Sequence, residues 1–149
     1  MVPVVLIVLL LLSIGFYEAR KAYWDHRVTE LCSKDAGVKV YEHVTLSAQD
    51  YERLGGTPYG LPLPSEEGAK GFPYFVQVAE SKIHDGNPVV MRLETLVRRR
   101  SDGKLLARSI TYFRRGGDFP TGLLHDSSFG CAQPEDLTKQ IFKVGEEAK

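Results

Sequence analysis

Residues 89–115 read VVMRLETLVRRRSDGKLLARSITYFRR and carry the strongest hairpin signal of the chain. Two runs rich in β-branched and large apolar residues flank Asp102-Gly103, a pair that favours a two-residue type I′ turn. Such a turn would place Leu93 opposite Tyr112 and Val97 opposite Arg108. We expect one face of this hairpin to point into the core. That face carries Met91, Leu93, Val97, Leu106, Ile110 and Tyr112.

The hairpin is expected to belong to an antiparallel meander of about four strands. Residues 74–83 (YFVQVAESKI) predict the strand before it, joined by a turn over residues 84–87. Nearer the N-terminus, residues 38–46 (VKVYEHVTL) alternate and predict another strand.

Two helices are predicted outside the meander. Ser47, followed three residues later by Asp50, is typical of a helix start and predicts a short middle helix over residues 47–54. Pro134, with two acidic residues after it, predicts a C-terminal helix over about residues 134–144. Residues 55–73 and 116–130 are rich in glycine or proline and are expected to form long loops. The sequence therefore predicts an α+β fold.

The N-terminus predicts a transmembrane anchor over residues 1–20. Residues 2–17 contain no charge, and as a helix they would contact a lipid bilayer over roughly 24 Å. The helix is expected to continue as a juxtamembrane helix as far as Gly37, a favourable residue after a helix end. Residues 21–149 are expected to form a single soluble domain. A cleaved signal peptide is the alternative, although the run has no basic segment before it and no small-x-small cleavage site after it.

The chain has two cysteines, Cys32 near the start of the expected domain and Cys131 near its end. Their spacing suits a disulfide that closes a long loop, which would persist only in an oxidising compartment. Two unrelated buried thiols are the alternative. The basic residues Arg20, Lys21 and Arg27 follow the anchor, so the charge rule taken alone would put the domain in the cytoplasm. The cysteine pair favours the extracytoplasmic side.

Positive charge is concentrated in residues 82–115, which hold nine basic and three acidic side chains although the formal net charge of the chain is zero. We expect Arg92, Arg98 and Arg100 to project from the sheet face opposite the core, where guanidinium groups would bind an anionic partner. The alternative is a solvated sheet face whose charges discourage aggregation. No base-stacking motif accompanies the arginines, so a nucleic-acid partner is not expected.

No catalytic, metal-binding or cofactor-binding residues are predicted. Residues 125–128 (HDSS) are adjacent in one loop and cannot form a catalytic triad, which needs three groups that converge in space. The four histidines and two cysteines lack zinc-ligand spacing, and no glycine-rich phosphate loop is present. These patterns favour a non-enzymatic protein. A small hydrolase or thiol enzyme using the two long loops is the alternative.

Several runs resemble a group of uncharacterised proteobacterial envelope proteins that are membrane-anchored or secreted. The resemblance covers most of the expected domain and is carried by residues 24–25, 31–37, 40–42, 99–106, 114–120 and 127–131. It implies a bacterial envelope setting and a Cys32–Cys131 bond, and it implies no activity. We therefore expect a single-pass inner-membrane protein whose periplasmic domain binds a protein or an anionic envelope component. An anchored protein with a cytoplasmic domain remains the alternative.

Overall fold

The computed structural model describes residues 2–53, 61, 63, 71–118, 126–132 and 137–145. These fall into two compact units. Unit 1 comprises residues 1–36, 80–92 and 111–131, and unit 2 comprises residues 37–79, 93–110 and 132–149. Three long strands each contribute one end to unit 1 and the other end to unit 2.

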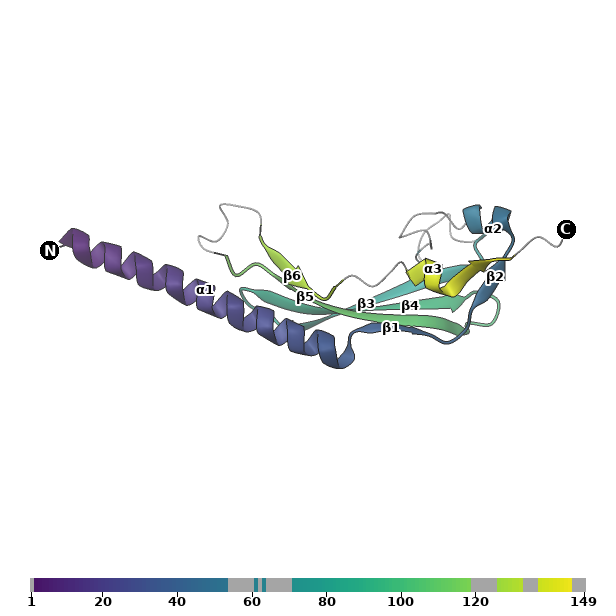
Figure 1. Cartoon of the computed structure of the whole chain (residues 1–149), viewed down its shortest axis with the longest axis horizontal. Helices are drawn as coiled ribbons and strands as arrows, with labels where there is room; N and C mark the ends of the chain where they lie inside the picture. Colours follow the sequence, from purple (N-terminus) through teal and green to yellow (C-terminus); the bar gives the residue numbers. More distant parts are fainter. Residues whose placement is uncertain are drawn as a thin grey trace. The chain divides into compact units, whose positions relative to one another are not determined.

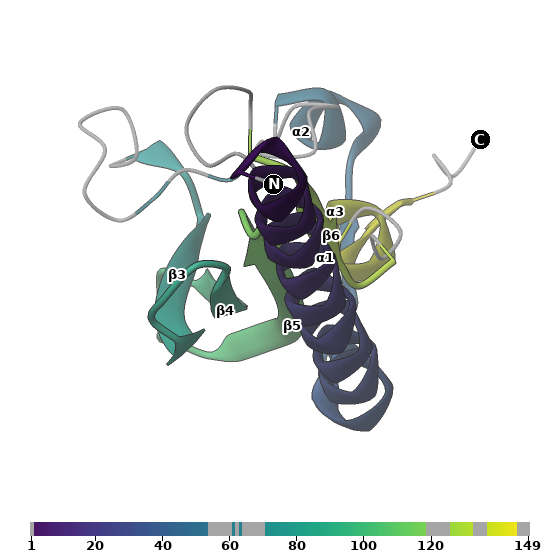
Figure 2. The ribbon, with the colours of Figure 1, turned by 90° about the vertical axis from the view of Figure 1, so that its left-hand side faces the viewer.

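The sheet confirms the predicted α+β architecture with its antiparallel strands. Its order is β1 (Gly37–Val40), β5 (Leu105–Arg115), β4 (Val89–Arg99) and β3 (Tyr74–His84), and Figure 2 shows β4 between β3 and β5. A short strand, β6 (Ser128–Gly130), also pairs with β5. The strand predicted over residues 38–46 pairs with β5 only through residues 37–40.

The turn between β4 and β5 differs from the predicted two-residue turn. Arg99 donates its backbone N–H to Lys104 O (2.9 Å), and Gly103 donates to Arg99 O (2.9 Å), so residues 100–103 form the loop. Gly103 has a φ of 69°, which favours glycine. Lys104 therefore pairs with Arg99, and the register of β5 against β4 is shifted by two residues from the predicted register. A shift of two residues keeps each side chain on its face, and Val97, Leu106, Ile110 and Tyr112 are buried as predicted.

Unit 1 contains the long helix α1 (Val2–Asp35), shown in purple and blue in Figure 1. The helix ends just before Gly37, as the sequence predicted, and Ala36 N–H donates to Cys32 O. Its Val28 is fully buried, as is Val90 of β4. Cys32 is bonded to Cys131, with Cα atoms 5.5 Å apart, so the predicted disulfide is confirmed.

Unit 2 has its core between the sheet and a small second sheet. β2 (Val44–Leu46) pairs in parallel with β7 (Phe142–Val144), and these strands lie beside α2 (Ala48–Arg53) and α3 (Leu137–Ile141) in Figure 1. The core contains Leu61, Tyr74, Val97, Leu106, Ala107, Ile141 and Phe142.

Three predicted boundaries are wrong. The strand over residues 38–46 is split, because the N–H groups of Tyr41 and Glu42 both donate to Leu106 O and the chain then joins β7 instead of β5. The C-terminal helix ends at Ile141, since the following residues form β7. The loop over residues 116–130 ends in β6, which pairs with β5. Most of residues 55–73, and residues 119–125 and 133–136, lie outside the described chain.

Candidate anion-binding surface

Two of the three arginines predicted to bind an anion, Arg98 and Arg100, lie together at the end of β4 in unit 2. Arg98 donates from Nε to Gln77 Oε1 (2.9 Å) and from Nη1 to Gly103 O (2.9 Å). Arg100 donates from Nε to Phe72 O (3.0 Å), and its guanidinium carbon lies 5.1 Å from the centre of the Phe75 ring. We call Phe75, Gln77, Arg98 and Arg100 the outer-face cluster.

The outer-face cluster lies on the sheet face opposite the core of unit 2. Tyr74 is buried in that core, and Val76 packs against it. Because side chains alternate along a strand, Phe75 and Gln77 of β3 project to the other face. Arg98 and Arg100 contact these two side chains, so they lie on the outward face, as the sequence predicted.

Arg98 and Arg100 differ from the other basic side chains of residues 82–115. Among the residues that the structure describes, no carboxylate lies within 4 Å of either guanidinium. The other seven basic groups each have a carboxylate partner within their own unit. These pairs are Lys82–Asp85, Arg92–Asp35, Arg99–Glu42, Lys104–Glu42, Arg108–Glu94, Arg114–Asp25 and Arg115–Asp126.

Arg92 belongs to unit 1 and lies apart in sequence from this cluster. Its Nε is 3.6 Å from Asp35 Oδ2, and the same oxygen accepts a hydrogen bond from the Tyr112 hydroxyl at 2.6 Å. Burial of Tyr112, together with its bond to Asp35, raises the pKa of that hydroxyl. The charge of Arg92 is therefore compensated inside unit 1, and the candidate surface consists of Arg98 and Arg100.

Arg99 lies between Arg98 and Arg100 in the sequence, but its charge is paired with carboxylates of unit 2. It donates to Glu42 and to Asp102, whose oxygen lies 3.0 Å from Arg99 Nη1. Glu42 also contacts Lys104 Nζ at 2.5 Å, and Lys104 together with Arg99 lowers the pKa of the Glu42 carboxyl. Each oxygen of this carboxylate thus lies next to one cation, Oε1 next to Arg99 and Oε2 next to Lys104.

A second polar cluster fixes the juxtamembrane part of α1 within unit 1. Lys21 donates to Asp118 Oδ1 (2.7 Å), and Ser127 donates its backbone N–H (2.6 Å) and its hydroxyl (2.8 Å) to the same carboxylate. Lys21 and then Ser127 hold the pKa of Asp118 far below its usual range. In the same unit, the Trp24 ring of α1 stacks on the His84 ring of β3, with centroids 4.3 Å apart. The sequence analysis did not predict this cluster, because it joins residues that are distant in the chain.

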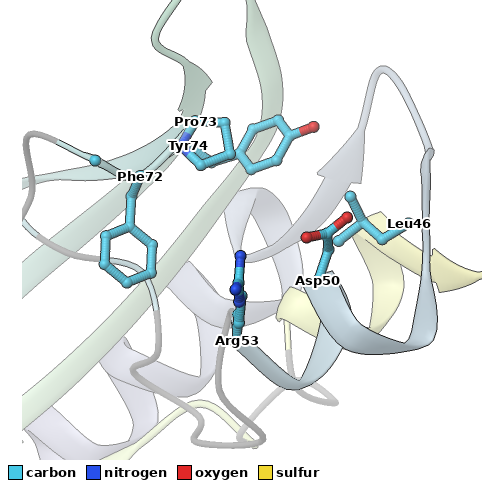
Figure 3. Close-up of a pocket in the computed structure, with 7 residues that line it drawn as sticks. Leu46, Asp50, Arg53, Phe72, Pro73 and Tyr74 are labelled. Atoms are coloured by element: carbon cyan, nitrogen blue, oxygen red, sulfur yellow. The ribbon is translucent and has the colours of Figure 1, made fainter.

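Unit 2 also has a pocket of about 430 Å³. In Figure 3 the Arg53 side chain of α2 lies between Phe72 and Asp50. Asp50 is held by Ser47, whose hydroxyl donates to it at 2.8 Å and accepts the Asp50 N–H in return. Arg53 is therefore the charged group that this pocket offers. The lining residues are Leu46, Asp50, Arg53, Gly71, Phe72, Pro73 and Tyr74.

The described residues contain no group of histidine, cysteine, aspartate and glutamate side chains that could hold a metal ion. Both cysteines are consumed by the disulfide, so neither is a thiol nucleophile in this form of the protein. Of the HDSS run, Ser127 is bonded to Asp118, and His125 lies outside the described residues.

No protein-family model matches the chain, and the comparisons with curated proteins and with solved structures find no similar protein. The geometry of the described residues is therefore the basis for assigning a function.

Proposed function

We propose that this chain is a non-enzymatic, single-pass inner-membrane protein of the bacterial envelope, whose periplasmic domain binds a protein or an anionic envelope component. Residues 2–17 anchor it in the lipid bilayer, and the outer-face cluster binds the partner. The chemical basis is the fork of N–H donors on each guanidinium, which fits a carboxylate or phosphate.

The observation that carries this proposal is the contrast between the two candidate arginines and their neighbours. Seven basic groups of residues 82–115 have carboxylate partners, whereas Arg98 and Arg100 are bonded to neutral acceptors in the part of the chain that is described. Their Nε atoms are held by Gln77 Oε1 and Phe72 O, which orients each guanidinium without neutralising it. Positive charge that is oriented, and that has no carboxylate partner among the described residues, supports electrostatic recognition of an anion.

The anchor is supported by the exposure of its side chains. By length and composition, α1 can cross a membrane, and none of its apolar window is buried within the protein. Leu9, Leu11 and Leu12 are each more than half exposed, and a contiguous apolar surface of this kind marks a membrane or protein contact. The hydroxyl of Ser13 donates to Leu9 O, so this polar group is satisfied within the helix.

The periplasmic placement is supported by the disulfide between Cys32 and Cys131, because such bonds persist in oxidising compartments. The basic residues after the anchor favour the opposite orientation by the charge rule. A reporter enzyme fused at the C-terminus, active only in the periplasm, distinguishes the two orientations. Activity in intact cells is expected, and an inactive reporter on a chain that is expressed and found in the membrane fraction would reject the periplasmic assignment.

Binding is tested with the full chain in nanodiscs of neutral phosphatidylcholine and with polyphosphate as the polyanion probe. The variant Arg98→Gln/Arg100→Gln is expected to weaken binding by about tenfold or more at low salt, with a smaller difference at high salt. The variant Lys82→Gln/Arg108→Gln is the matched control, since it removes the same charge from groups paired with Asp85 and Glu94. Equal weakening by both double variants would mean that polyphosphate senses only net charge, and would reject the outer-face cluster as the site.

A further inference from the structure

β3 forms one edge of the five-stranded sheet. β3 is the last strand in the sheet order, and no other described strand pairs with its outer edge. Every residue from 77 to 83 is exposed, on both faces of the strand. Val78 is 45% exposed, a large value for a valine in a strand. An open edge of this kind presents unpaired backbone N–H and C=O groups to another chain.

The part of β3 in unit 2 lacks the features that usually protect an edge. Natural edge strands are commonly short, charged or interrupted by proline. The opposite edge strand, β1, has four residues and so fits this rule. Residues 75–79 (FVQVA) contain neither a charge nor a proline, in a strand of 11 residues. This stretch is therefore suited to pairing with an added strand.

The backbone direction of β3 identifies the groups that would pair. Arg100 N–H donates to Pro73 O at 2.8 Å, so the carbonyl group of Pro73 points toward the side of β4. Along an antiparallel strand the peptide groups alternate between the two neighbouring sides. The N–H and C=O groups of Val76 and Val78 consequently point toward the open edge.

We propose that residues 75–79 of β3 accept an extended acidic segment of a partner protein as an added strand. The main chain of that segment would bond to Val76 and Val78, and its carboxylates would bond to Arg98 and Arg100. Both guanidinium groups contact side chains of β3. A strand added at the edge of β3 would lie about 4.8 Å from β3, so its side chains would be close to both groups. This inference rests on the proposed function and specifies its partner.

A second copy of this chain fits the edge less well than an acidic segment. Residues 74–79 contain no carboxylate. Antiparallel pairing of two β3 edges would also place the arginines of both copies on the same face of the joined sheet, where like charges repel. The charge of the outer-face cluster therefore selects an acidic partner strand.

The test uses the full chain in neutral nanodiscs and a labelled peptide of alternating threonine and glutamate, about ten residues long. The control peptide has the same sequence with N-methylated backbone amides, which keep the charge but cannot form strand pairing. Val78→Pro removes one edge N–H, and Val78→Thr is its matched control because it keeps that N–H. The methylated peptide also tests the edge independently of whether Val78→Pro folds.

Three changes are each expected to weaken peptide binding by about tenfold or more: backbone methylation, Val78→Pro and Arg98→Gln/Arg100→Gln. Val78→Thr should bind like the unaltered protein. Equal binding of the methylated peptide would overturn strand addition, and if the double arginine variant still weakened binding, the proposed anion site would stand. Failure of the unmodified peptide to bind would also overturn strand addition, while the polyphosphate measurement decides the proposed function separately.

Discussion

The Nε atom of Arg114 lies 2.5 Å from Oδ1 of Asp25, and the Arg114 side chain is only 2% exposed. The guanidinium also donates to Gly116 O and to the hydroxyl of Ser127. Asp25 lies on α1 and Arg114 on β5, so this pair attaches the juxtamembrane helix to the sheet within unit 1.

Removal of the Asp25 carboxylate should destabilise the protein, because a buried guanidinium would lose its counter-charge. Asp25→Ala is expected to cost about 1–3 kcal/mol, less than a fully buried pair, since the Asp25 side chain is 28% exposed. Urea unfolding in detergent micelles, followed by fluorescence of the sole tryptophan, Trp24, measures the change. Glu30→Ala is the control on the same helix. It removes an exposed pair with Arg27 and should cost less than about 1 kcal/mol. Similar costs for the two variants would contradict a special role for Arg114.

The disulfide should contribute strongly to stability, because it joins residues 99 positions apart. Cys32→Ser/Cys131→Ser is expected to lower the free energy of unfolding by about 2–5 kcal/mol. Mass spectrometry after maleimide treatment of the denatured, unreduced protein gives an independent check. Protein isolated from its native membrane should take up no maleimide before reduction and two afterwards. Labelling before reduction would show that the thiols are free in the cell, which removes the argument for an oxidising compartment.

Local sequence patterns predicted the strands well and the turn less well. Residues 105–115 form the strand predicted for them, since a run rich in β-branched and large apolar residues follows the turn signal at Asp102-Gly103. The turn was misplaced because Asp102 binds both Lys104 N–H and Arg99, contacts that favour a four-residue loop over the type I′ turn. Four of the six residues predicted to face inward, Val97, Leu106, Ile110 and Tyr112, are nevertheless buried, as a two-residue shift preserves side-chain direction. Met91 and Leu93 are only half-buried, and Val90 is fully buried instead.

Pairing between distant segments explains the remaining differences. Residues 142–144 extend a helical pattern, but they form β7 because β2, about a hundred residues earlier, supplies a parallel partner. The partners of the arginines also depend on contacts between distant segments. The outward direction of Arg98 and Arg100 follows from alternation along the strand, whereas the contact of Arg92 with Asp35 depends on where α1 packs. The pairing of each cation could therefore not be predicted from charge counts alone.

The N-terminal helix should remain on the mature protein. Carbonate washing of membranes is expected to leave the chain in the pellet, and mass spectrometry should find residues 2–17 in the extracted protein. Leu9→Arg/Leu11→Arg places two charges in the apolar stretch and should shift the chain out of the membrane fraction. Leu9→Ile/Leu11→Ile is the control, because it keeps the hydropathy. A soluble product that begins between residues 19 and 22 would identify a cleaved signal peptide instead.

Stability should depend on acid pH through Asp118. Hydrogen bonds from Lys21 and Ser127 lower the pKa of this carboxyl in the folded state below its unfolded value of about 3.9. Its contribution is therefore complete above about pH 5, and it is lost as the pH falls below about 4 and through the lowered folded-state pKa. Asp118→Asn removes the carboxylate and should cost about 1 kcal/mol or less at neutral pH, since water screens the partly exposed pair.

The pH dependence separates this effect from a general loss of packing. As the pH falls below about 4, the difference in the free energy of unfolding between Asp118→Asn and the unaltered protein should shrink progressively, because protonation removes the same charge that the substitution removes. Urea midpoints measured between about pH 3 and 7 give both curves. Asp85→Asn is the matched control, since it removes one carboxylate from an exposed pair with Lys82. A difference between Asp118→Asn and the unaltered protein that stays constant over the whole range would show that the Asp118 charge does not stabilise the attachment of α1.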